Sequence, residues 1–493
     1  ERPLSVGSGG TLGLDSAGGI GQSATGILHA AALEMLAEDS VDLQSENLIT
    51  HLSAALGPVG SRFDFHTTGD LNVASVGGTE GIDARGARAE LSCGGTMTFE
   101  RDLVTSGDVR LETGEGISQT AEGALTASSV QVLSGGPIAL DSVASDVAAL
   151  AARLTAEGAA LAFLAGGELR VASAGQTTGI ETSSGDVAIG SPHGIGLDGP
   201  IMAGGGKIRI EGPTTTPRDE VIQLEGSTVT FTDRLSPGGD DAVGEIAVAG
   251  NLRLKSGSAL HVNVEGVQEG EHDAIEVMDG HLILENGEPA LSGQVTSVLS
   301  VGDALSVVEA AAATEGSFEA GSAVEISGQP LSLDYGTGVR LVRQVAEWVW
   351  LGGAADGLWS RPGNWTAPTG HPADGDVVRF ASIAAGSVPE NDIPDLTLDS
   401  IVFSGGAASS REIQGRGVAL TGGVVNEAGG PRTVAMPVEL AADLTFRAEN
   451  APLNFAGGID GPHQLTLEGD ERLMLTGPVG HGLPLTRLSA AGT

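Results

Sequence analysis

The chain has 493 residues, of which 77 are glycine, whereas aromatic residues make up only 3% and charged residues 18%. This composition excludes large aromatic-rich cores and favours narrow interiors of stacked aliphatic side chains, with glycine at the tight corners. The net charge of −40 repels phosphate backbones and anionic membranes, so we expect no nucleic-acid partner and some affinity for divalent cations instead.

Cys93 is the only cysteine, so the chain can form neither an intramolecular disulfide nor a cysteine metal site. A long solenoid does not need disulfides, because its core runs continuously along its axis, and a single cysteine is therefore compatible with secretion. No run reaches the roughly 18 apolar residues of a membrane span, so we expect no membrane insertion of this segment. The first residues carry no signal-peptide pattern, and both ends interrupt a repeat, as expected of a segment of a larger protein.

An internal duplication dominates the first half of the chain. Residues 19–30 (GIGQSATGILHA) return as residues 116–127 (GISQTAEGALTA), and residues 65–75 return as residues 163–173. The offset rises from 97 (20 to 117) to 98 (65 to 163), which indicates loops of variable length between retained strands. Repetition on this scale is typical of an array in which each unit buries its apolar face against its neighbours.

Short strands alternate with glycine turns from about residue 10 to residue 231. Each strand alternates apolar with polar residues, as expected of a strand with one buried face. Equivalent strands recur at about 20 residues, which is the length of one coil of a parallel β-helix. We therefore predict an all-β fold, a parallel β-helix (β-solenoid) of about 24 coils and on the order of 115 Å in length. We expect the winding to be right-handed, although the sequence does not determine the hand.

Two segments have partial helical character. Residues 27–37 contain a mixed apolar run, and residues 146–156 are rich in alanine. The second segment has an extended counterpart in the first copy of the duplication, at residues 48–55, so strand-plus-loop structure remains the alternative for both segments.

The repeats over residues 15–213 resemble those of filamentous-haemagglutinin-type surface proteins. The resemblance is carried by residues 116–127, by Gly135-Gly136-Pro137-Ile138-Ala139-Leu140 and by Gly167-Glu168-Leu169-Arg170-Val171. We assign residues 1–231 to a haemagglutinin-like solenoid with tandem repeats over about 19–115 and 116–213. The resemblance implies a bacterial surface or secreted protein.

A second pattern follows at about residues 232–345. Leu235-Ser236-Pro237-Gly238-Gly239, then residues 256–264 and the strand His272-Asp273-Ala274-Ile275-Glu276-Val277, resemble the passenger repeats of autotransporter-like adhesins. Residues 316–318 and 333–335 are expected to close this unit. The resemblance implies a further β-helix unit.

All four tryptophans, Trp348, Trp350, Trp359 and Trp365, lie within residues 348–365. Together with residues 372–380 they resemble the pattern that opens a new stretch of β-helix in large bacterial surface proteins. We predict a Trp-rich junction with strands over residues 346–421 and further solenoid repeats over residues 422–493, continuing past the chain end. Exposed indoles would stack on glycans or form a surface contact, whereas two indoles on one strand face and two after glycine turns favour packing as a core or cap.

Catalytic patterns are incomplete in this sequence. His193-Gly194 followed by residues 207–210 faintly resembles elements of polygalacturonases, but the acidic elements that should precede them are missing, and Asp240-Asp241 lies downstream in a predicted turn. His272 and Asp273 are adjacent in a strand and should point to opposite faces, with His272 exposed to solvent or stacked on its neighbours. No nucleophile elbow is present, and His193, His261 and His281 lack zinc-site spacing.

Calcium-binding nonapeptides appear only as fragments, at residues 194–198 and 238–241. We therefore expect no cofactor, and at most weak calcium binding. The predicted function is a non-catalytic, extracellular structural or adhesive solenoid of a bacterial cell surface, which acts by attachment to cells or matrix or by self-association. The alternatives are a secreted polysaccharide lyase or hydrolase on the same scaffold, and an appendage or surface-layer subunit that polymerises.

Overall fold

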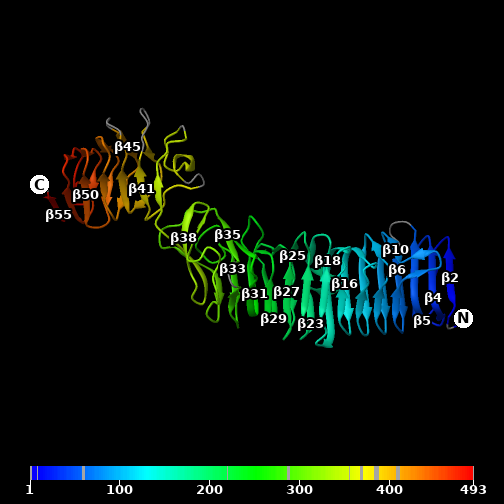
Figure 1. Ribbon diagram of the computed structural model, residues 1–493. Coiled ribbons are helices and arrows are strands. Elements are labelled where there is room, and N and C mark those ends of the chain that lie inside the picture. Colours follow the sequence, from blue (N-terminus) through cyan, green and yellow to red (C-terminus); the bar gives the residue numbers. More distant parts are fainter. Residues whose placement is uncertain are drawn as a thin grey trace.

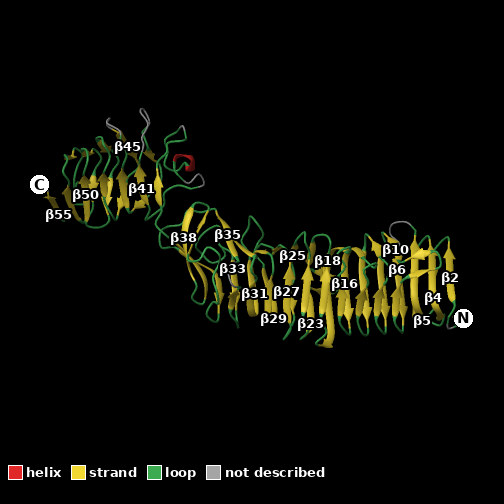
Figure 2. Ribbon diagram, viewed as in Figure 1, coloured by secondary structure: helices red, strands yellow, loops and turns green. Residues whose placement is uncertain are grey.

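The computed structural model describes residues 3–7, 9–57, 62–218, 220–285, 289–354, 356–366, 370–381, 388–406 and 411–491. Strands make up 55% of the structure and helix 1% (Figure 2). The chain winds into about 21 coils with equivalent positions about 22 residues apart, which confirms the predicted all-β solenoid. Figure 1 shows an elongated molecule in which a longer solenoid is followed by a shorter one, with the two chain ends at opposite extremities.

The first solenoid stacks parallel strands in register. Strand β11 (Arg88–Cys93) pairs with β6 (Arg62–Thr67) on one side and with β14 (Asp108–Thr113) on the other, so that Leu91 lies between Phe65 and Leu111. These three side chains are at most 1% exposed. Alternation of inward apolar with outward polar residues along each strand therefore builds a continuous aliphatic core.

The two segments with helical character are strands. Residues 27–37 contribute β4 (Leu28–Ala37), and residues 146–156 lie in β18 (Asp146–Glu157). Each runs parallel to its neighbour, β4 beside β5 (Val41–Leu56) and β18 beside β16 (Leu125–Ser134). Of the two interpretations, the strand alternative is confirmed, because burial between two neighbouring coils outweighs the helix propensity of alanine.

Both copies of the duplication carry the same hairpin. The antiparallel pair β8 (Ser75–Val76) and β9 (Thr79–Glu80) corresponds to β21 (Ser173–Ala174) and β22 (Thr177–Thr178). Each hairpin is inserted between two strands of one coil, and it therefore lengthens that coil. The strands that flank the first hairpin both pair with β5, and those that flank the second both pair with β18. The first hairpin lies in the chain between Phe65 and its strand partner Leu91. No hairpin lies between Leu91 and its next partner, Leu111, and these two residues are closer in sequence. The mean spacing of about 22 residues is thus longer than the periodicity of the sequence predicted.

The first solenoid ends in antiparallel strands. Strand β36 (Ala304–Ala310) pairs in parallel with β33 (Ala274–Val277) and antiparallel with β39 (Gly338–Arg343). Strand β38 (Gln329–Asp334) lies antiparallel between β37 (Ala323–Ile326) and β39. The two segments expected to close this unit do meet, since the rings of Phe318 and Tyr335 are 6.4 Å apart.

The second solenoid begins at β40 (Glu347–Val349) and has its own hydrophobic core. Its strands form a seven-stranded, a five-stranded and a four-stranded sheet. The seven-stranded sheet includes β41 (Val377–Phe380), β44 (Ser400–Phe403) and β50 (Leu444–Ala448). The core of the first solenoid ends at Leu341 and that of the second starts at Ala346, so the two cores meet at a short joint.

Candidate functional site

The four tryptophans form the first layer of the second core. Trp350 and Trp365 meet edge to face with centroids 5.0 Å apart, and Trp359 meets Trp365 in the same way at 5.9 Å. Phe380 from β41 packs against all three rings. The exposed fractions of Trp348, Trp350, Trp359 and Trp365 are 2%, 1%, 0% and 1%. The expectation of surface contact or glycan stacking by these indoles is corrected, because all four side chains are buried.

Strand pairing and a short turn bring these rings together. Trp348 lies in β40, Trp350 forms an isolated antiparallel bridge with Trp365, and the 3₁₀ turn at Pro362–Asn364 leads into Trp365. The indole N–H of Trp365 donates to the carbonyl oxygen of Trp359 at 2.7 Å. The cluster thus starts the second aromatic and aliphatic stack, as the core interpretation of the sequence predicted.

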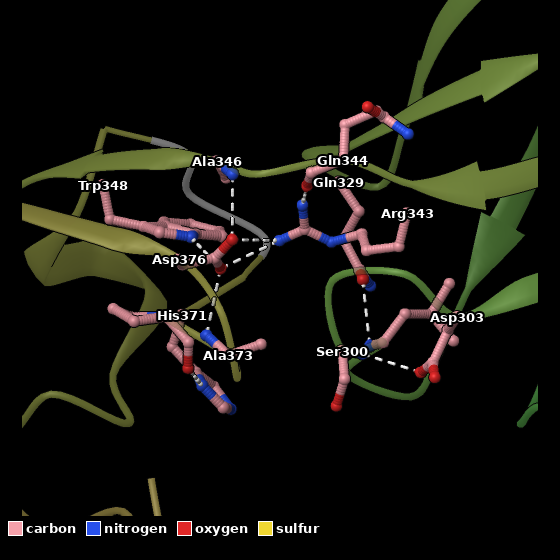
Figure 3. A network of polar contacts seen from close by, with 12 residues as sticks. Ser300, Asp303, Gln329, Arg343, Gln344, Ala346, Trp348, His371, Ala373 and Asp376 are labelled. Atoms are coloured by element: carbon pink, nitrogen blue, oxygen red, sulfur yellow. Dashed lines mark hydrogen bonds and ion pairs between the residues drawn. The ribbon is translucent and has the colours of Figure 1, made fainter. Parts of the chain in front are cut away.

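A buried ion pair lies at the joint between the two cores (Figure 3). Arg343, the last residue of β39, donates through Nη2 to both carboxylate oxygens of Asp376, at 2.9 and 2.8 Å. Both side chains are fully buried. Asp376 also accepts the backbone N–H groups of Ala346 and Ala373 and the indole N–H of Trp348, at 2.8, 3.0 and 2.7 Å.

This network connects the last strand of one solenoid to the first coil of the next. Burial raises the pKa of Asp376, while the surrounding N–H donors and the Arg343 guanidinium oppose that effect. A carboxylate with this many donors is held in one position, and its complete burial leaves no access for a substrate. The arrangement suits a mechanical joint.

Backbone contacts reinforce the joint. The N–H of Val301 donates to the carbonyl oxygen of Asp374 at 2.9 Å. Gly375 has a φ of +84°, and a Cβ at this position would lie 2.6 Å from the Cβ of Val301. Only glycine fits both the left-handed backbone and the close approach. The turn before Asp376 is therefore pressed directly onto the end of the first solenoid.

A second buried polar network holds the turn at residues 237–244. The carboxylate of Asp273 accepts the backbone N–H of Gly244 at 2.8 Å and that of Asn263 at 2.7 Å. The Asn263 amide in turn donates to the carbonyl oxygens of Gly239 and Ala242, at 2.8 and 2.9 Å. Burial raises the pKa of Asp273 to about 7. Residues of the second sequence pattern, at 232–345, thus belong to one internal hydrogen-bond network.

The structure disperses the catalytic candidates. His193 and Asp240 with Asp241 lie exposed on separate turns. His272 was expected to be exposed to solvent or stacked on its neighbours; it is only 9% exposed, and Asp273 beside it is 1% exposed. The solvent-facing alternative was wrong, because the loop at residues 265–271 folds back and pairs His272 with Val264. Cys93 is buried, which raises the pKa of its thiol to about 12 and disfavours a nucleophilic thiolate.

Arg343, Asn263 and Asp376 carry no sequence signal of an anchoring role. Asp376 lies in the motif at residues 372–380, whose pattern does not predict its burial, and an arginine at the end of a strand gives no signal that it will be buried. The burial of Arg343 becomes understandable only in the structure, which places it beside the Asp376 carboxylate, 33 residues later in the chain.

Among the described residues, no three or more His, Cys, Asp or Glu side chains are placed to share a metal ion. The described part of the chain also has no helix with the length and apolar character needed to cross a membrane. Comparisons with protein-family models, with curated proteins and with solved structures found no match.

Proposed function

We propose that this chain is a non-catalytic structural or adhesive rod of a bacterial cell surface, which acts through contacts along its sides. The observation that carries the proposal is that two buried polar networks connect parts of the fold internally. Arg343 with Asp376 fastens the joint, and Asn263 with Asp273 fastens a turn, all with side chains removed from solvent. Buried polar networks of this kind make a scaffold rigid, and a rigid scaffold suits a mechanical role.

An extracellular setting is supported by one feature of the chain and is compatible with two others. Its repeats resemble those of haemagglutinin-like and autotransporter-like surface proteins. Its one cysteine is buried and free, so folding requires no disulfide chemistry. Its net charge of −40 keeps separate rods apart in solution and makes their association dependent on salt.

The proposal is tested by an attachment assay with the full chain coupled to fluorescent beads. We expect beads to adhere to bacterial cells or matrix-coated plates, and rods to self-associate more strongly as sodium chloride or calcium is raised, because screening weakens repulsion between rods. Beads carrying heat-unfolded chain are the control. No adhesion and no association at any salt concentration would contradict the proposal.

The enzymatic alternative is tested in parallel with the same preparation. The chain is incubated with pectin, alginate and neutral glycans, and new reducing ends or unsaturated products are measured. We expect no turnover. Cleavage that a single Asp or His substitution abolishes would replace the structural role with a polysaccharide lyase or hydrolase.

A further inference from the structure

A groove of about 520 Å³ lies on the outer surface of the last parallel coils of the first solenoid. Its lining residues include members of β31 (Glu245–Leu254), β33 and β36. Figure 1 shows β31 and β33 toward the end of the first solenoid that adjoins the second. Its lining includes three small side chains, Ala247, Ala274 and Ala304. The volume lies within the range of binding pockets for small ligands or short peptide segments.

Four glutamates line this groove: Glu245, Glu269, Glu276 and Glu309. No lysine or arginine lines it, and within the described part of the chain none of the four carboxylates has an ion-pair or hydrogen-bond partner. Glu276 and Glu309 are directly opposite each other on parallel strands, roughly 4.8 Å apart at the backbone. Like charges in this position destabilise a sheet, so a cation that entered the groove would relieve the repulsion.

His272 provides an independent indication of a ligand. It lines the same groove, is 91% buried (100 − 9), and has a ring nitrogen, Nδ1, that is sealed from solvent without a hydrogen-bond partner among the described residues. A buried polar atom without a partner carries a free-energy cost that a bound donor or acceptor removes. Nδ1 of His272 is thus a polar atom of a groove-lining residue that no described residue satisfies.

The spread of the charges indicates what kind of cation fits. No three of the groove's acidic and histidine side chains are close enough to hold one metal ion, so the charges suit a ligand with several separate cationic groups. The apolar residues of the lining offer contact to the aliphatic stems of lysine or arginine. No Phe, Trp or Tyr lines the groove, so it offers no stacking platform for sugar rings.

We propose that this groove binds a basic segment of a partner protein, with lysine or arginine side chains paired to Glu276 and Glu309, and that a turn of the His272 ring toward the segment gives Nδ1 the hydrogen bond that it lacks. Charge-assisted hydrogen bonds of this kind are stronger than neutral ones. The inference rests on the proposed role of the chain as a rod that acts through contacts along its sides, and the groove is one such contact site.

The test measures binding of an acetylated, amidated tetralysine peptide to the full chain by isothermal titration calorimetry. The groove variant is Glu276→Gln with Glu309→Gln. The matched control is Glu80→Gln with Glu325→Gln, two exposed strand glutamates outside the groove. Each pair of substitutions changes the net charge equally, from −40 to −40 + 2 = −38.

We expect the groove variant to weaken tetralysine binding at least tenfold and the control to change it less than twofold, at low salt. His272→Gln should weaken binding severalfold, and raised salt should weaken it further because the contacts are ionic. Equal weakening by both double variants would show that the peptide responds only to overall charge, and no measurable binding would also overturn the inference. Tighter binding of a glucosamine oligomer than of tetralysine would identify an aminosugar as the occupant and overturn the assignment to a peptide.

The salt dependence separates this inference from the proposed function. Self-association and adhesion of the rods should strengthen with salt, whereas peptide binding in the groove should weaken. If tetralysine fails to bind while adhesion of the beads persists, the groove assignment alone is wrong. If adhesion fails while the peptide still binds, the rod's adhesive role is wrong and the groove assignment stands.

Discussion

Alternate residues of β20 (Leu169–Val171) face opposite sides of the coil wall. Leu169 and Val171 are completely buried, whereas the Arg170 side chain is 54% exposed and pairs with Asp198. Val171→Asp should therefore lower the free energy of unfolding by about 4 kcal/mol or more, because the interior offers the charge no partner. Arg170→Asp should cost no more than about 1 kcal/mol. Urea unfolding followed by circular dichroism measures both, and equal losses would show that the facing of this strand is wrong.

Asp273 gives the first solenoid a pH-dependent stability. Burial raises its pKa to about 7, well above the value of about 3.9 for an unfolded chain. At a pH between these two pKa values, Asp273 has lost its proton in the unfolded chain and keeps it in the folded chain. Its contribution to the free energy of unfolding therefore falls as pH rises. From pH 5 to pH 7 the loss is about 2–3 kcal/mol.

The measurement compares unfolding free energies of the wild type, Asp273→Asn and Asp241→Asn at pH 5, 6, 7 and 8. Asp241 is an exposed turn residue in the same part of the fold. We expect the advantage of the wild type over Asp273→Asn to shrink as pH rises and to level off above pH 7. Asp241→Asn should follow the wild type, and a parallel curve for Asp273→Asn would contradict the assignment.

At the scale of elements, the duplicated hairpins are held by equivalent anchors. Glu34 accepts the N–H of Gly78 and the hydroxyl of Thr79 at 2.8 and 2.9 Å, while Gln131 donates to the hydroxyl of Thr177 at 2.8 Å. The sequence separation of the two anchors, 131 − 34 = 97, is the repeat offset.

Removal of one anchor should therefore loosen one hairpin only. Gln131→Ala removes a hydrogen bond worth about 1 kcal/mol, so amide exchange over residues 173–178 should rise about fivefold while residues 75–80 stay unchanged. Glu34→Ala should have the opposite pattern. Hydrogen-exchange mass spectrometry measures both hairpins in one experiment, and simultaneous loosening of both would show that the hairpins are not independently anchored.

Strand positions and burial were predictable from alternation, but the placement of the repeats was not. Ile20 pairs with Val41, which in turn pairs with Phe63, whereas its repeat partner Ile117 stands in the column of Leu71. Phe63 and Leu71 lie on consecutive strands of one coil. The repeat offset is thus not a whole number of coils of about 22 residues, and the second copy is turned onto another side of the solenoid.

The candidate sites were less predictable than the fold. Sequence proximity identified the tryptophan cluster, because all four residues lie close together in the chain. Arg343 and Asn263 gained their roles from partners brought close by coil winding and loop closure, which local patterns do not encode. The groove glutamates likewise come from separate coils and an intervening loop. The sequence around each of them predicts only an ordinary solvent-exposed residue.

On the scale of the whole molecule, the joint couples two separate cores. Arg343→Met would leave the Asp376 carboxylate buried without its cation, which should cost about 3–5 kcal/mol. Tryptophan fluorescence reports this region directly, because all four indoles lie in the first layer of the second core. We expect its urea midpoint to fall strongly in Arg343→Met and little in Arg379→Met, whose ion pairs with Glu347 and Glu427 are on the surface. Equal shifts would contradict a fastening role for the buried pair.

The proposed mechanical role requires that the coils stay stacked as one elongated body in solution. About 21 coils at roughly 4.8 Å give a length on the order of 100 Å, and a rod of that length has a radius of gyration of about 30 Å. A compact globule of the same number of residues would have about 23 Å. Small-angle X-ray scattering of the dilute chain at physiological salt measures this quantity. We expect the larger of these two radii together with the intensity decay of a rod, whereas the smaller radius with a globular profile would contradict an elongated, stacked solenoid.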